Sequence, residues 1–440
     1  MWRIKTGGIL LFPILGFLFL SCATTNPYAG IDNEVYRGNY EDGLAAIDGH
    51  KKNIYRDKDL ILYHLDKGMV NHYARRYEDS IQNLQDGERA IEEAYTKSIT
   101  MEIGSYILND RTREYDGEDY EDIYINAFNA LNYYHLRNTE DALVEIRRMN
   151  NKLQFLSSKY GVITSNLQKQ ALESSAAIPY DPESATVQFS DSALARYLGL
   201  LFYRGIGQYD DARIDRDHLK LAFANAPSVY TYPPPQSLEE ELEIPPGKAR
   251  LNVIGFSGLS PVKVEETVRI PLPNERWVKI ALPVMEYRPS LVSRIEVRVN
   301  EDAPFVLELL EDIEAVARET FKEKVGLIYF KSVLRAVTKG LTSSVLSGAS
   351  EEVGGQAGLA LWLVSLGTQA FAEASERADL RISRYFPAKA WVGGINLDPG
   401  VYTLHINYYA ANGRLLATYI DDQVTVREGA LNLAEAVCVR

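Results

Sequence analysis

The stretch YARRYEDSIQNL, residues 73–84, contains a polar turn followed by an aromatic residue, an acidic pair and a small residue. The same order recurs in YRGNYEDGLAAI from Tyr36, HLRNTEDALVEI from His135 and GIGQYDDARIDR from Gly205. A Tyr or Thr follows the turn in every copy: Tyr40, Tyr77, Thr139 and Tyr209. Three positions later comes a small residue: Gly43, Ser80, Ala142 or Ala212. Because acidic side chains stabilise the positive end of a helix dipole, each Tyr or Thr is predicted to begin a helix.

This segment resembles the junction between the two helices of a tetratricopeptide (TPR) repeat. In that family the small residue allows close helix packing, and a second small residue stands nine positions before the aromatic one. Gly68 and Ala130 occupy that place here, whereas the fourth copy has Leu200 with Gly199 beside it. The copies are 37, 62 and 70 residues apart, whereas the family repeats every ~34 residues. The resemblance therefore predicts a TPR-like helical repeat domain over residues 31–227 with longer helices or loops between copies.

Stacked helical repeats bury a continuous core and leave a concave face. In the TPR family this groove is lined by polar and aromatic side chains of the first helices. The corresponding residues here are Asn71, Asn129, Tyr133 and Tyr203. Tyrosine combines a large apolar body with a hydroxyl group, which suits binding surfaces, although packing between helices is the more common role of a Tyr at helical spacing. The resemblance makes these four residues candidates for binding a partner.

The composition changes at SVYTYPPPQSLEEELEIPPGKAR, from Ser228, which holds five prolines and a run of acids. Proline interrupts helices, so residues 228–249 are predicted to form a semi-rigid linker. From Arg250 onward apolar and polar residues alternate, as expected of half-buried strands. The alternation is clearest at Ile295, Val297 and Val299, and again at Tyr402, Leu404, Ile406 and Tyr408.

A helical insertion is expected at about residues 304–380, between the two groups of strands. It contains residues 353–372, a run of 20 residues without a charge. The length permits a transmembrane helix, but glycines and polar residues favour a helix buried against the sheet. Contact with a membrane surface or a partner helix stays open. Residues 250–440 are thus predicted to be an α+β domain, with a sandwich-like sheet and a helical insertion.

The chain begins with a charged segment and an uncharged apolar run that ends in FLFLSCATTNPY, residues 17–28. This layout is typical of a secretory signal, and Phe19-Leu20-Ser21-Cys22 resembles the bacterial lipobox. The resemblance implies a signal peptide over residues 1–21, acylation of Cys22 and a lipidated tether over residues 22–30. A thiol behind an uncleaved anchor is the alternative. By resemblance to Gram-negative sorting, Ala23 favours the outer membrane, with the protein facing the periplasm.

The composition bears on the remaining function classes. The net charge of −13 becomes −15 when Arg3 and Lys5 leave with the signal peptide. Nucleic acids and anionic lipids bind clustered basic residues, so neither is an expected partner; solubility alone also explains the acidity. The six histidines have no metal-ligand spacing, and no phosphate-binding loop or nucleophile motif occurs. We therefore expect no metal, no cofactor and no enzymatic activity.

The signal, the helical half, FKEKVGLIYFKSVLRAVTKG and the tail ERADLRISRYFPAKAWVGGINLDPGVYTL together resemble an uncharacterised family of bacterial lipoproteins. RADLR followed by LDPGVYTL is the most specific part of that resemblance. It implies architecture and location but no activity. The leading interpretation is a lipid-anchored scaffold or adaptor that binds envelope proteins through the TPR-like groove. The alternative is a lipoprotein that binds peptidoglycan or another glycan through aromatic side chains.

Overall fold

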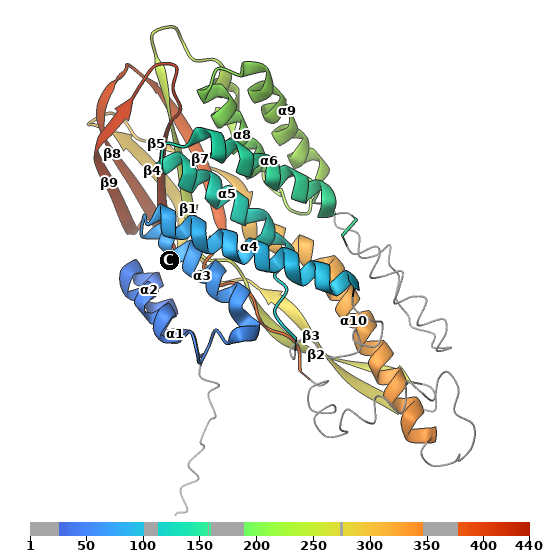
Figure 1. Ribbon diagram of the computed structural model, residues 1–440. Coiled ribbons are helices and arrows are strands. Elements are labelled where there is room, and N and C mark those ends of the chain that lie inside the picture. Colours follow the sequence, from blue (N-terminus) through green and yellow to red (C-terminus); the bar gives the residue numbers. More distant parts are fainter. Residues whose placement is uncertain (1–25, 101–112, 157, 160–188, 273–275, 346–376) are drawn as a thin grey trace, which may run out of the picture.

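The computed structural model describes residues 26–100, 113–156, 158–159, 189–272, 276–345 and 377–440 (Figure 1). Cys22, the expected signal peptide and the uncharged run 353–372 lie outside these residues. Within the described ranges, no helix has both the length and the apolar character that a membrane crossing requires. The chain is a mixed α+β protein.

The helices of the first half are α1 (Ala29–Arg37), α2 (Tyr40–Gly49), α3 (Leu60–Tyr73), α4 (Tyr77–Thr100), α5 (Asp119–His135), α6 (Thr139–Leu156), α8 (Ala193–Gly205) and α9 (Tyr209–Asn225). They pack in sequential pairs that lie side by side. The second helix of each pair begins at the predicted residue, namely Tyr40, Tyr77, Thr139 or Tyr209. The turn pattern in the sequence therefore located these four helix starts.

Small residues lie where paired helices approach each other most closely. Ser80 Oγ donates a hydrogen bond to the Gly68 carbonyl oxygen over 2.8 Å. A Cβ atom added at Gly68 would lie only 2.7 Å from Leu84, so a larger side chain would push α3 and α4 apart. In the fourth pair the close approach occurs at Gly199, whose added Cβ would collide with the Asp215 carboxylate. Gly199 thus has the role of the small residue, and Leu200 is buried in the core.

The turn inside each pair contains one residue with left-handed backbone geometry, two positions before the second helix. These residues are Gly38 (φ 83°), Arg75 (φ 60°), Arg137 (φ 61°) and Gly207 (φ 79°). Glycine adopts this geometry freely, whereas a residue with a Cβ atom is strained by it. The four turns therefore share one conformation although two of them lack glycine.

Replacing Arg137 with Gly is expected to raise the free energy of unfolding by about 0.5–1 kcal/mol, because it relieves that strain. Arg137→Ala keeps the Cβ atom and should give no such gain, which separates backbone strain from loss of the exposed side chain. Gly207→Ala should lower stability by about 1 kcal/mol, since only the backbone geometry opposes a methyl group there. Urea unfolding followed by circular dichroism measures all three. Equal stability of Arg137→Gly and Arg137→Ala would contradict the explanation.

The strands are β1 (Ala249–Ser257), β2 (Val262–Leu272), β3 (Arg276–Glu286), β4 (Val292–Val299), β5 (Phe305–Val306), β6 (Glu308–Asp312), β7 (Lys389–Leu397), β8 (Gly400–Ala410), β9 (Leu415–Val426) and β10 (Asn432–Cys438). One four-stranded sheet has the order β10-β1-β7-β6, and a second has the order β5-β4-β8-β9. β1 pairs parallel with β10 and antiparallel with β7. β2 and β3 form a separate hairpin.

The first sheet lies between the helices and the second sheet. On β1, Leu251 and Val253 share a core with β4 and β8, whereas Ile254 and Phe256 share a core with the helices. Successive side chains of a strand point to opposite faces, and all nine residues of β1 are buried. One side of the helical layer is thus covered by a sheet of the same chain.

The proline-rich segment 228–249 packs against both halves and is not the semi-rigid linker that its composition predicts. It includes a 3-10 helix, Gln236–Leu242. The buried Glu241 in this turn forms ion pairs with Arg204 of α8 and Arg250 of β1. Tyr230 stacks on Phe223 of α9, with ring centroids 4.3 Å apart. Because proline excludes helix without excluding burial, composition alone does not distinguish a packed connection from a free one.

The helical insertion is represented by α10 (Ile313–Val345), which begins at the end of β6. α10 runs along the β2–β3 hairpin, and together they extend away from the layered part of the molecule (Figure 1). The start of α10 is in the core, where Ile313, Val316 and Ala317 are fully buried.

Candidate functional site

The predicted groove residues Asn71 and Asn129 are buried, with 1% and 0% of their surface exposed. The first sheet packs on the helices, and Phe128 of α5 contacts Phe256 of β1 with ring centroids 5.2 Å apart. Because both side chains are enclosed by their own chain, the interpretation of Asn71 and Asn129 as partner-binding residues on an open groove is corrected.

Tyr133 and Tyr203 are half-buried. The Tyr133 hydroxyl accepts a hydrogen bond from Gln85 Nε2 over 3.1 Å, so it joins α5 to α4. Tyr203 of α8 packs against the main core. Their described contacts are contacts between neighbouring elements of this chain, which is the alternative that the sequence left open for tyrosines at helical spacing.

Residues 378–386, which form neither helix nor strand, lie against the helices beside the first sheet. This segment includes most of RADLR, the part of the tail with the most specific family resemblance. The buried Asp66 carboxylate of α3 accepts hydrogen bonds from Ser383 Oγ (2.8 Å), the Arg384 backbone N–H (2.7 Å) and the Tyr55 hydroxyl (2.9 Å). Glu121 of α5 accepts one from the Ser383 backbone N–H over 2.5 Å. The helices thus bind both backbone and side-chain donors of this segment of their own chain.

Two arginines of this segment are paired with helix carboxylates. Arg384 donates two hydrogen bonds to Asp32 of α1, over 3.0 and 2.6 Å. Arg381 pairs with Asp59 over 3.0 Å and with Asp379 over 2.7 Å. Such paired arginine contacts fix geometry as well as charge, so the segment holds α1 and α3 to the sheet layer.

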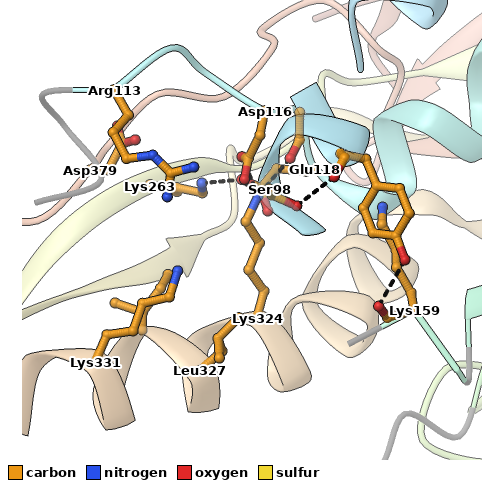
Figure 2. A pocket seen from close by; sticks show the side chains of 13 residues that line it. Ser98, Arg113, Asp116, Glu118, Lys159, Lys263, Lys324, Leu327, Lys331 and Asp379 are labelled. Atoms are coloured by element: carbon orange, nitrogen blue, oxygen red, sulfur yellow. Dashed lines mark hydrogen bonds and ion pairs between the residues drawn. The ribbon is translucent and has the colours of Figure 1, made fainter. Parts of the chain in front are cut away.

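A small cavity of about 60 Å³ lies where the first residues of this segment meet α10, β2 and the loop before α5 (Figure 2). Basic side chains from several elements line it: Arg113, Lys159, Lys263, Lys324 and Lys331. Lys324 donates to Asp116 over 2.8 Å and to Glu118 over 3.1 Å, and Lys263 forms an ion pair with Glu118. The Lys324 ammonium lowers the pKa of Asp116 well below its usual range despite burial.

These pairs connect α10 and β2 to the start of α5. Because Glu118 is buried and also begins that helix, loss of either lysine would leave a buried carboxylate poorly compensated. Figure 2 shows Lys263 and Lys324 directed at Glu118 instead of into open space. The chemistry of this cavity is that of an ion-pair junction which positions the arm formed by α10 and the β2–β3 hairpin.

A larger cleft of about 280 Å³ opens where the helices meet the edges of both sheets. We call it the seam cleft. Helix residues Tyr40, His72, Tyr73, Arg75 and Tyr77 form one side, and Tyr419 of β9 with Glu435, Ala436 and Val437 of β10 form the other. Arg75 is exposed, and its guanidinium lies 4.9 Å from the centre of the Tyr419 ring. Tyr40, Tyr77 and Tyr419 are half-buried, so this aromatic surface is partly open to solvent.

Glu435 lies at the floor of the seam cleft between two histidines. His72 Nε2 is 2.6 Å from one carboxylate oxygen and His135 Nε2 is 2.9 Å from the other. His72 Nδ1 faces the Asn132 side-chain oxygen over 2.7 Å. Both nitrogens of His72 therefore face acceptors, as in an imidazolium. Burial opposes this charge, but Glu435 raises the pKa of His72, and His72 lowers the pKa of Glu435.

These direct contacts leave no space for a metal ion between the three side chains. No group of His, Cys, Asp or Glu in the described part of the chain has the arrangement of a metal site. The sequence did not indicate this cluster, because 63 residues separate His72 from His135 and another 300 separate His135 from Glu435. The only local signal is that both histidines lie in the last turn of the first helix of a pair.

The Glu435→Gln substitution is expected to lower the free energy of unfolding by about 2 kcal/mol at pH 6, because a buried imidazolium loses its counter-charge. The difference from the unchanged protein should shrink by pH 8. A raised pKa makes the His72 contribution full at low pH and lost as the pH rises through the pKa. Urea unfolding at the two pH values measures this. A deficit that is the same at pH 6 and pH 8 would contradict an ionic cluster.

No protein family, curated protein or solved structure compared with the chain matches it. The described fold places the chain in the class of mixed α+β proteins in which paired helices cover one sheet of a two-sheet layer. Its candidate site is the seam cleft, and any more particular function is a proposal.

Proposed function

We propose that this protein is a lipid-anchored periplasmic adaptor that binds a protein of the cell envelope through the seam cleft. Acylated Cys22 would hold it at the outer membrane, and its helix pairs would constitute a TPR-like array. The shared turn geometry, the small residues between paired helices and the predicted helix starts support the TPR-like interpretation. The proposal moves the binding surface from Asn71 and Asn129, which are buried, to the cleft at the edges of the sheets.

The observation that carries the proposal is the composition of the seam cleft. Four tyrosines and an exposed arginine gather there, and tyrosine and arginine are the residue types enriched at the energetic centres of protein interfaces. The whole chain has a net charge of −13, so a cleft lined by aromatic rings and a guanidinium differs from the average character of the chain. The cleft also joins the helices to both sheets, which gives it rigid walls.

A photo-crosslinking residue at position 77 of the full chain tests this in intact cells. We expect it to capture one or a few defined envelope proteins. The same residue at position 209 is the matched control, because Tyr209 also begins the second helix of a pair and is 58% exposed but lies outside the cleft. The same captured proteins at both positions, or none at position 77, would remove the proposal.

The proposed lipid anchor at Cys22 can be tested separately. Mass spectrometry of the membrane-extracted protein should find an acylated N-terminal Cys22 and no residues 1–21. Cys22→Ser should release the chain from the membrane fraction, because stable attachment depends on acyl chains. An unmodified thiol behind an intact leader would contradict the lipoprotein interpretation.

A second function, binding of peptidoglycan or another glycan, is favoured by the rings of Tyr40, Tyr77 and Tyr419 in the same cleft. Aromatic faces with hydroxyl tips suit sugar rings, which have apolar faces and polar edges. Co-sedimentation with purified peptidoglycan separates the two. The glycan function would be supported over the adaptor if peptidoglycan retains the protein, if Tyr77→Ala abolishes this retention, and if no protein is captured from position 77.

A further inference from the structure

β10 is an edge strand, because the sheet order places only β1 beside it. In a parallel strand, alternate residues direct their N–H and C=O groups toward one neighbour and the remaining residues direct theirs to the other side. The Leu433 backbone N–H donates to the Tyr134 hydroxyl over 2.9 Å, so Leu433 is directed away from β1. By the same alternation, Glu435 and Val437 also present their backbone groups outward.

The outward backbone groups of Glu435 and Val437 differ from those of Leu433 in their hydrogen bonding. Tyr134 satisfies Leu433 on both sides, since its hydroxyl also lies 3.2 Å from the Leu433 carbonyl oxygen. Glu435 and Val437 instead line the seam cleft and are partly exposed, and no described residue forms a hydrogen bond with their outward backbone groups. Unpaired edge groups are a template for another strand.

The charges around this edge favour an acidic occupant. Glu435 itself is compensated by His72 and His135. Arg75 at the rim forms no ion pair with a described residue, whereas the neighbouring Arg76 is paired with Asp79 over 2.6 Å. The tyrosine rings on the helix side leave room for apolar or aromatic side chains. A short extended segment with one acidic side chain would complement the open backbone groups of β10, the Arg75 guanidinium and the tyrosine rings.

We propose that the seam cleft binds a short extended peptide segment of a partner protein, which adds to β10 as a strand at Glu435 and Val437 and places an acidic side chain at Arg75. This inference rests on the proposed adaptor function and specifies the chemistry of its partner. Addition of a strand to an open sheet edge takes affinity from backbone hydrogen bonds and specificity from pockets for alternate side chains. The cavity volume limits the paired stretch to a few residues.

The test uses a phage-displayed library of random dodecapeptides selected on the full mature chain. We expect enriched peptides to contain an acidic residue next to a short run without proline. N-methylation of the bound peptide at alternate positions should weaken binding at least tenfold, because a methylated nitrogen donates no hydrogen bond. The amides of Glu435 and Val437 should exchange hydrogen more slowly in the complex.

Arg75→Glu should weaken binding of the selected peptides at least tenfold. Arg137→Glu is the matched control, since Arg137 has the same backbone geometry in the next helix pair but is outside the cleft; it should leave binding unchanged. Circular dichroism of both variants shows whether the fold is retained. Selection of no peptide, protection of amides elsewhere, or equal effects of the two variants would overturn the proposal.

Failure of this inference is distinguishable from failure of the adaptor function. If position 77 captures envelope proteins while every selected peptide tolerates N-methylation throughout, the adaptor function stands and strand addition is wrong. If peptides bind as expected and position 77 captures nothing in cells, the cleft recognises extended segments and the adaptor function is wrong.

Discussion

The Asp66→Ala variant should lose about 3–5 kcal/mol of unfolding free energy, because the substitution leaves several buried hydrogen-bond donors without an acceptor. Asp66 receives hydrogen bonds from Tyr55, Ser383 and the Arg384 backbone. It is completely buried, so water cannot replace the carboxylate without opening the structure. The same contacts hold residues 378–386 against the helices, so α3 and the sheet layer should separate in the variant.

Chemical denaturation followed by tryptophan fluorescence measures this loss. Asp66→Asn keeps one acceptor oxygen and should lose about 1–2 kcal/mol. Asp398→Ala is the control, since this aspartate is exposed and its ion pair with Lys248 is on the surface; it should change stability by less than about 0.5 kcal/mol. Comparable losses for Asp66→Ala and Asp398→Ala would show that residues 378–386 do not depend on this carboxylate.

The second large effect is on the pH dependence of stability. Burial raises the pKa of Asp66 to about 6, and burial raises the pKa of Glu311 to about 7. Burial, assisted by the charge of Glu118, raises the pKa of Glu121 to about 7. Glu311 lies in β6 and accepts hydrogen bonds from the Tyr124 and Ser192 hydroxyls, over 2.6 and 2.9 Å, and from the Leu194 backbone at the start of α8. These three groups sit between the helices and the strands.

A carboxyl group whose pKa is higher in the folded state stabilises the protein fully below its unfolded pKa, and this contribution is lost as the pH rises through the folded pKa. Each shift of two units corresponds to about 3 kcal/mol. Stability should therefore fall by at least about 3 kcal/mol between pH 5 and pH 8. Below about pH 4 it should fall again, because ion pairs with Arg384 and Arg381 lower the pKa of Asp32 and Asp379.

Urea unfolding at half-unit intervals from pH 4 to pH 8.5 gives the profile. Glu311→Gln should make stability fall less steeply between pH 5 and pH 8, because the number of protons released on unfolding falls by about one. Glu308→Gln, three residues earlier in β6 and partly exposed, should leave the slope unchanged. A stability that rises from pH 5 to pH 8 would contradict the assignment of raised pKa values to these buried carboxyl groups.

Local sequence patterns were sufficient to predict where the second helix of each pair begins. The start of each second helix depends on a turn, an acidic first turn and a small residue within about six positions, and all these signals lie in one continuous stretch. Tyr40, Tyr77, Thr139 and Tyr209 were therefore predicted as helix starts and are confirmed. The strands containing Ile295 and Leu404 were likewise predicted from alternation, since one face of the second sheet is buried and the other is not.

The candidate site was not predictable in this way. Asn71 and Asn129 were expected on an open groove because a helical repeat array has a concave face, but both side chains are buried within this chain. In the sequence, Arg75 is one residue of a polar turn, and no local pattern distinguishes it. It is a candidate binding residue because its guanidinium lies over the ring of Tyr419 in β9. Residues 228–249 were predicted as a semi-rigid linker because proline content reports on backbone geometry and not on burial.

The starts of the second helices, their turns and the strand alternation could be predicted from the sequence, since each depends on residues a few positions apart. The packing of the first sheet on the helices, the Glu435 cluster and the seam cleft depend on tertiary structure alone. Glu435 is 363 residues from His72 along the chain, and no local periodicity records such a contact. What covers a helical layer depends on which distant segment matches its shape, its charges and its buried hydrogen-bond donors.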